Sequence, residues 1–138
     1  MKRWIAILAL IVITLSAYAV YQIRQKRAQQ RRESTYQSLL GSYSEVLKPG
    51  MSRKDVEGYL NAKNVRFTQM CCVAQHTGAF DDLTKIGQED APWYCSEQNI
   101  YVAVQFNAAE RYKNPRTETD PSDTLRAITI FRWLEGCL

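Results

Sequence analysis

Four cysteines and one histidine are the residues of this chain with the most specific chemistry. The cysteines are Cys71, Cys72, Cys95 and Cys137, and the histidine is His76. An even number of cysteines in a small domain behind an N-terminal export signal typically forms disulfides. The first residues of this chain have the outline of such a signal. We therefore predict two structural disulfides among the four cysteines, and no cofactor.

A metal site or a thiol-dependent enzyme is the alternative use of the same residues. His76 and Cys71-Cys72 could contribute to a zinc site, but zinc ligands usually come in pairs spaced by two to four residues, and adjacent cysteines chelate poorly. The sequence also lacks a Cys-x-x-Cys redox motif. His76 is thus a metal candidate that the spacing disfavours, and we predict no metal site.

Polar side chains are densest in residues 74–94, which we expect to form a long loop. Asp81-Asp82 could act as paired carboxylates and His76 as a base, but no nucleophile or oxyanion donor stands at a recognisable spacing. We therefore predict no catalytic residues and a protein that is not an enzyme. Long loops often bind partners, and exposed aromatic side chains often anchor interfaces. The interface candidates are Trp93, Tyr94 and Tyr101.

Three segments alternate between apolar and polar residues as strands do. They are residues 65–73, 99–107 and 124–134, and residues 83–86 are a candidate for a short additional strand. In the second segment, alternate residues from Ile100 to Phe106 are expected to face the core. The outward positions of that segment are Tyr101, Ala103 and Gln105.

An antiparallel meander of these three strands would bring all four cysteines to one edge of the sheet. Cys71 and Cys72 are neighbours on a strand, so their side chains should point to opposite faces and not pair with each other. We therefore expect Cys95 to pair with one of them and Cys137 with the other, in an order that the sequence leaves open.

Two helical patterns precede the strands. In the first, apolar residues recur at helical spacing from Tyr36 to Leu47, and Lys48-Pro49-Gly50 ends the pattern. In the second, Ser52 is a good N-cap and Asp55 follows three residues later. The expected buried face of this helix consists of Val56, Tyr59 and Leu60.

The segment LKPGMSRKDVEGYL at residues 47–60 resembles the Gly-Met-Ser/Thr-x-x-x-Val-x-x-x-Leu signature of SmpA/OmlA (BamE-like) envelope domains. The resemblance implies two helices followed by a three-stranded antiparallel sheet, as also found in β-lactamase-inhibitor-like proteins. The same element order follows from the patterns above, so we expect an α+β domain with two helices packed on three strands. The residues that match the signature are Gly50, Met51, Ser52, Val56 and Leu60.

The first 32 residues predict where the chain works. An apolar run from Trp4 to Ile23 contains no Gly, Pro or charge. It has the roughly 20 residues that a helix needs to cross a hydrocarbon core of about 30 Å. Bases follow it from Arg24 to Arg32. We predict a signal-anchor transmembrane helix at residues 1–23, a basic juxtamembrane stem at 24–33 and a small α+β domain at 34–138.

Two other interpretations of the N-terminus remain open. Ala17-Tyr18-Ala19 fits a signal-peptidase site, and cleavage after Ala19 would give a secreted protein. The bases after the apolar run outnumber Lys2 and Arg3, which by the positive-inside rule would place the domain in the cytoplasm with reduced cysteines. The cysteines favour export. We therefore expect a single-pass protein of the bacterial inner (cytoplasmic) membrane with a periplasmic domain.

The net charge of +4 comes from the N-terminal segment alone. Residues 1–33 hold seven of the 18 bases and one of the 14 acids, so residues 34–138 carry a net charge of −2. A nucleic-acid-binding domain should show a basic face of its own, so we predict no nucleic-acid partner. The expected partners are membrane lipid, through residues 4–23 and the basic stem, and another envelope protein. The sequence thus predicts a membrane-anchored, disulfide-stapled interaction or assembly module.

Overall fold

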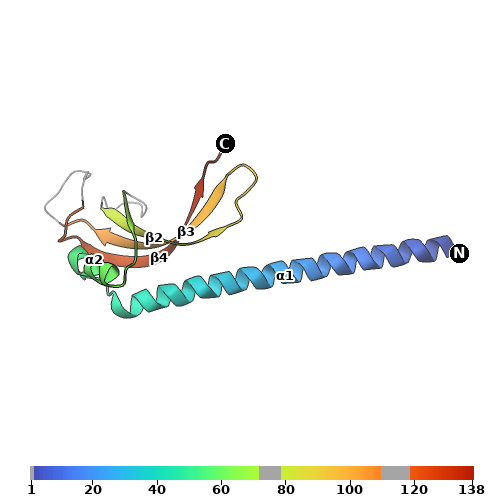
Figure 1. The fold of residues 1–138 in the computed structure, drawn as a ribbon, viewed down its shortest axis with the longest axis horizontal. Helices are drawn as coiled ribbons and strands as arrows, with labels where there is room; N and C mark the ends of the chain where they lie inside the picture. Colours follow the sequence, from blue (N-terminus) through green and yellow to red (C-terminus); the bar gives the residue numbers. More distant parts are fainter. Residues whose placement is uncertain (1, 72–78, 110–118) are drawn as a thin grey trace. The chain divides into compact units, whose positions relative to one another are not determined.

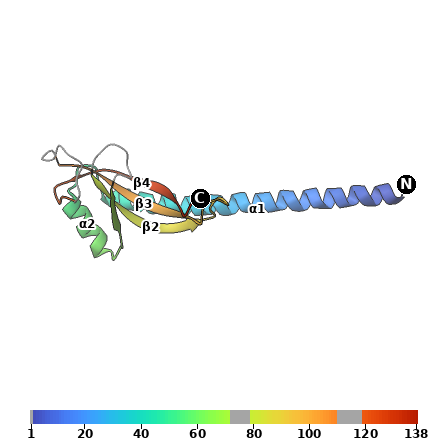
Figure 2. The ribbon, with the colours of Figure 1, turned by 90° about the horizontal axis from the view of Figure 1, so that it is seen from above.

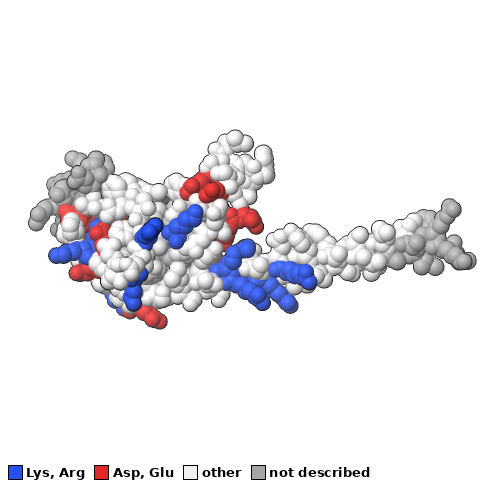
Figure 3. Space-filling view, viewed as in Figure 1, with Lys and Arg blue, Asp and Glu red and all other residues white. Residues whose placement is uncertain are grey.

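The structure is a computed structural model that describes residues 2–71, 79–109 and 119–138. The chain divides into two compact units, Met1–Gln37 and Ser38–Leu138. Helix α1 (Lys2–Val46) begins in the first unit and ends in the second. All five bases at positions 24–32 are exposed on α1, where Lys and Arg form a blue band in Figure 3.

The apolar run near the N-terminus is the first part of α1. Across the described residues, no helix combines the length and the apolar character that a membrane crossing requires. The predicted signal-anchor transmembrane helix at residues 1–23 is not supported by this finding. Its second half, from Thr14 to Gln22, contains five polar side chains, and the helix continues without a break into the charged segment.

The second unit contains a four-stranded antiparallel sheet in the order β1-β2-β3-β4 (Figure 1). The strands are β1 (Thr68–Cys71), β2 (Phe80–Glu89), β3 (Glu97–Asn107) and β4 (Thr124–Glu135). The predicted three-stranded sheet is wrong because the middle of the expected loop, Phe80–Glu89, forms β2. In the sequence, Asp81 and Asp82 hide this strand, since ionisable side chains are rarely buried inside a sheet.

The additional strand changes which strand ends meet, because it reverses the chain once more. Cys71 pairs with Phe80 at one end of the sheet, whereas Glu97 pairs with Glu135 at the other. The expected gathering of Cys71 with the later cysteines is therefore wrong.

The predicted pairing of the cysteines is wrong for the same reason. Cys95 forms a disulfide with Cys137 and with neither member of the Cys71-Cys72 pair. Cys71 is also disulfide-bonded. Cys72 and the metal candidate His76 lie outside the described residues.

One face of the sheet packs against α2 (Arg53–Ala62) and the last turns of α1. Figure 2 shows β2, β3 and β4 side by side, with α2 beside them. The predicted start of α2 is confirmed, since the backbone N–H of Asp55 donates to the Ser52 side chain at 3.2 Å. One cluster of buried hydrophobic residues in the core consists of Tyr43, Leu47, Val56, Leu60, Ala79, Val102, Val104, Phe106 and Leu125.

The face assignment along β3 is correct for the core positions. Ile100 and Phe106 are fully buried, as expected from their alternation. Ala103, expected to face solvent, is also fully buried. The second face of the sheet is therefore partly covered, and Tyr101 and Gln105 on it are half-buried.

Candidate functional site

The end of the sheet with the disulfide consists of the turn between β2 and β3 and the end of β4. The Cys95–Cys137 bond joins these two segments. The backbone N–H of Leu138 also donates to the carbonyl oxygen of Tyr94 at 2.9 Å. The C-terminus consequently lies beside the turn (Figure 1). We call residues 90–97 together with residues 133–138 the pinned tip.

Two further hydrogen bonds close the base of the pinned tip. Ser96 donates from its backbone N–H and from its hydroxyl to the carbonyl oxygen of Glu135, each at 3.0 Å. Gly136 permits this approach, because it has a φ of +59° and a Cβ there would lie 2.3 Å from the Ser96 hydroxyl oxygen. The turn is thus fixed against β4 by covalent and polar contacts.

Exposed apolar side chains gather on the pinned tip. Trp93 is 91% exposed, and Tyr94 meets it edge-on with ring centroids 5.8 Å apart. Trp133, Leu134 and Leu138 are exposed at the same end. Among the described residues of the second unit, Val46 is the one other large hydrophobic side chain with such exposure. Exposed tryptophan and tyrosine side chains are typical of surfaces that a partner covers.

Carboxylates lie beside these apolar side chains. The uncharged end of the hairpin is white in Figure 3, with red carboxylates next to it. Glu97 and Glu135 are direct cross-strand partners in the β3–β4 register. Arg132 lies 3.8 Å from Glu89. Within the described part of the chain, neither Glu97 nor Glu135 has a base at salt-bridge distance.

Tyr101 and Asn99 hold these two carboxylates in place. The Tyr101 hydroxyl donates to Glu135 Oε1 at 3.4 Å, and Asn99 Nδ2 donates to Glu97 Oε2 at 3.2 Å. Burial, followed by the nearby Glu135 and Glu97 carboxylates, raises the pKa of Tyr101. Its hydroxyl therefore keeps its proton at neutral pH and remains a donor.

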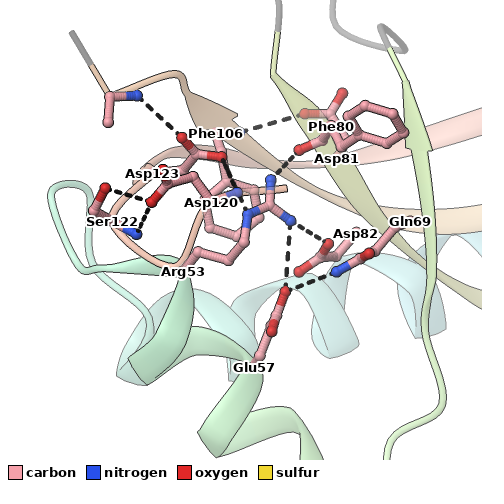
Figure 4. Close-up of polar contacts among 11 residues, drawn as sticks. Arg53, Glu57, Gln69, Phe80, Asp81, Asp82, Phe106, Asp120, Ser122 and Asp123 are labelled. Carbon is pink, nitrogen blue, oxygen red and sulfur yellow. Dashed lines mark hydrogen bonds and ion pairs between the residues drawn. The ribbon is translucent and has the colours of Figure 1, made fainter. Parts of the chain in front are cut away.

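The opposite end of the sheet contains a buried polar cluster around Arg53, the first residue of α2 (Figure 4). Arg53 is 1% exposed, and its Nη1 lies 2.6 Å from Asp82 Oδ1. Its Nη2 donates to the carbonyl oxygen of Phe80, and its Nε lies 3.5 Å from Asp123 Oδ2. The guanidinium carbon lies 3.8 Å from the centre of the Phe106 ring. Arg53 thus connects α2 to three strands or their ends.

The acids around Arg53 also bind backbone groups. Asp81 Oδ1 accepts the N–H of Phe106 at 3.3 Å, and Asp123 Oδ1 accepts the N–H of Ala109 at 3.0 Å. Glu57 Oε1 lies 3.6 Å from Arg53 Nη1. The predicted carboxylate pair Asp81-Asp82 is therefore buried and engaged in structural contacts.

The shared guanidinium does not satisfy every carboxylate oxygen. Asp82 Oδ2 is buried and has no hydrogen-bond partner among the described residues. Burial raises the pKa of Asp82 to about 7; Arg53 opposes this shift, and Glu57 and Asp81 add to it. The Asp82 carboxyl group is thus partly protonated at neutral pH.

We expect Asp82→Asn to reduce the pH dependence of unfolding between about pH 4 and pH 7. In this range the folded domain retains a proton on Asp82 that the unfolded chain has released, because the pKa is raised from 3.8 to about 7. The stabilisation of the folded state by this proton is present in full below the pKa of Asp82 in the unfolded chain. It is lost as the pH rises through the pKa of Asp82 in the folded domain.

Urea unfolding of the wild type and the variant across this pH range measures the effect. The control is Asp90→Asn, which removes an exposed carboxylate from the pinned tip. The free energy of unfolding of the wild type, relative to that of Asp82→Asn, should fall with rising pH. Parallel pH profiles for the two proteins would contradict the assignment of this proton to Asp82.

The structure brings four of the sequence-predicted site residues together at the pinned tip, and Tyr101 lies further along β3. Sequence reasoning missed Arg53, since an arginine in the first turn of a helix usually faces solvent. It also missed the Glu97–Glu135 pair, because that contact depends on the register of two distant strands. The four predicted residues at the tip are Trp93, Tyr94, Cys95 and Cys137.

Neither a metal site in the described ranges nor a known relative helps to assign a function to this chain. Among the described residues, no group of three or more His, Cys, Asp and Glu side chains has the geometry to hold a metal ion. The resemblance of residues 47–60 to SmpA/OmlA domains stays a prediction. No family model, no curated protein and no solved structure matches this chain.

Proposed function

We propose that the second unit is a non-enzymatic protein-binding module of an oxidising compartment such as the bacterial envelope, and that it contacts its partner through the pinned tip. The observation that carries this proposal is the 91% exposure of Trp93 on a turn whose base is covalently closed. Burying an aromatic ring of this size is among the largest gains that one side chain contributes to binding.

The fixed geometry of the tip supports binding as its role. A surface that is ordered before binding loses less conformational entropy on association. Here the Cys95–Cys137 bond and the two hydrogen bonds from Ser96 order the turn in advance. Trp93 and Tyr94 are thereby presented on a rigid support.

The disulfide also supports the proposal that the domain works in an oxidising compartment. Disulfides persist in oxidising surroundings such as the periplasm and are rare in the bacterial cytoplasm. Cys95 and Cys137 are 42 residues apart in the sequence, and the bond between them joins two elements of the folded domain. This is the arrangement of a structural disulfide, which favours an exported domain.

We expect Trp93→Ala and Tyr94→Ala to abolish capture of the partner by the tagged full chain. Truncation of a central aromatic anchor costs roughly 2 kcal/mol or more, which is about a thirtyfold loss of affinity. Cross-linking in cells, followed by affinity purification and quantitative mass spectrometry, would identify the protein and measure the loss.

The matched control is Val46→Ala, which truncates an exposed apolar side chain outside the tip. The control should capture the same protein as the wild type. Unchanged capture by both tip variants would refute the pinned tip as the contact surface.

A further inference from the structure

We infer that the pinned tip and the adjoining sheet face bind a cationic side chain, lysine or arginine, of the protein partner between Glu97 and Glu135. This inference rests on the proposed function and names the chemistry of the partner. It depends on three successive cross-strand pairs of β3 and β4: Glu97–Glu135, Asn99–Trp133 and Tyr101–Phe131. Alternate strand residues share a face, so these six side chains lie together, and we call them the acidic–aromatic face.

The two carboxylates of this face repel each other. Directly opposite residues have Cβ atoms about 4.5–5.5 Å apart, and like charges at that separation destabilise a sheet. Glu97 and Glu135 have no ion-pair partner within the described ranges. A positive charge between them would replace this repulsion with two charge-assisted contacts.

Acceptor atoms remain available on the acidic–aromatic face. Tyr101 and Asn99 each donate to one oxygen of a carboxylate, at Glu135 Oε1 and Glu97 Oε2. The other oxygen of each carboxylate can therefore accept a bond from a ligand. Asn99 itself is 2% exposed, and its Oδ1 has no hydrogen-bond partner in the described part of the chain. Unused acceptors of this kind match an ammonium or guanidinium group, which carries donors alone.

Aromatic rings complete the face. Trp133 is 39% exposed and lies next to Phe131 with ring centroids 5.6 Å apart. It occupies the position two residues before Glu135, on the same side of β4. A cation held by the carboxylates would lie beside these rings, and cation–π attraction favours that position. The same negative charge disfavours a phosphate-bearing ligand.

The test uses the oxidised full chain and acetyl-hexaarginine amide as the probe, titrated by isothermal calorimetry at low salt. We expect Glu97→Gln and Glu135→Gln each to weaken binding by about tenfold, since each removes one charge-assisted contact. Glu45→Gln, which removes an exposed carboxylate from the end of α1, should bind as the wild type does. Both tip variants should unfold at the same or a higher temperature, because the repulsion between opposed carboxylates is relieved.

Equal binding of the peptide by the wild type and by the Glu97→Gln/Glu135→Gln double variant would overturn the inference. So would a calcium-dependent rise in the unfolding temperature that the double variant lacks and that abolishes peptide binding, because the carboxylates would then hold a metal ion. Partner capture separates this inference from the proposed function. Loss of partner capture by Trp93→Ala, with full capture by the Glu97→Gln/Glu135→Gln variant, would overturn the cationic preference alone. Full capture by both variants would overturn the two proposals together.

Discussion

Arg53→Met is expected to destabilise the second unit by a large part of its total stability. Arg53 is 1% exposed and is the base that faces the fully buried carboxylates of Asp82 and Asp123. Removing one partner of a buried ion pair costs about 3–5 kcal/mol, because the remaining charge stays buried without compensation. Small domains have a total stability of about 5–15 kcal/mol, so this loss approaches the whole at the lower end.

Circular dichroism during urea unfolding measures this loss. The matched control is Lys54→Met, which makes the same kind of change at the next residue of α2, where the side chain is exposed. Its effect should stay within about 0.5 kcal/mol. Adding Asp82→Asn to Arg53→Met should recover part of the stability, since it removes one uncompensated carboxylate. Equal midpoints for Arg53→Met and Lys54→Met would contradict a structural role for the cluster.

Replacement of both Cys95 and Cys137 by serine is expected to have the second large effect. The bond closes a loop with a sequence separation of 42 residues. In the chain-entropy description, a loop of that length corresponds to about 4 kcal/mol of stability. The double variant should therefore unfold at a lower urea concentration and lose the fixed geometry of the pinned tip.

The double variant is more informative than chemical reduction, because Cys71 is disulfide-bonded as well. The wild type and the double variant are compared in oxidised form. Urea unfolding measures their stability, and fluorescence anisotropy of the tryptophans measures how firmly the tip is held. An unchanged midpoint would show that the bond contributes no stability. Unchanged anisotropy would show that the hydrogen bonds of the tip, from Ser96 and Leu138, fix the turn without the disulfide.

Local patterns in the sequence predicted the elements whose signals are local. The helix start at Ser52 follows from capping chemistry, and the interior positions of β3 follow from alternation. Of strand β2, the sequence indicated residues 83–86 as a candidate short strand, but not its first residues or its full length. Asp81 and Asp82 can lie inside a sheet because Arg53, 29 residues before Asp82, donates to that carboxylate from another element.

The predicted disulfide pairing was wrong because it was derived from a three-stranded sheet that lacked β2. With three strands, Cys71 would lie near Cys95 and Cys137, and with four it lies at the other end. The transmembrane prediction rested on the length of the apolar run and its lack of charge, and it gave little weight to the polar residues from Thr14 to Gln22. Trp93 and Tyr94 were identified by composition alone, whereas the opposition of Glu97 and Glu135 required the strand register.

The position of Cys95 just after the turn has a consequence for protein engineering. The disulfide and the Ser96 hydrogen bonds close the turn at its base, below Trp93 and Tyr94. We therefore expect the five residues 90–94 to tolerate exchange for other sequences without opening of the sheet. The cluster around Arg53, which secures the fold, lies at the far end of the same strands. The domain is consequently a scaffold on which a library of grafted loops can be displayed and selected for new targets.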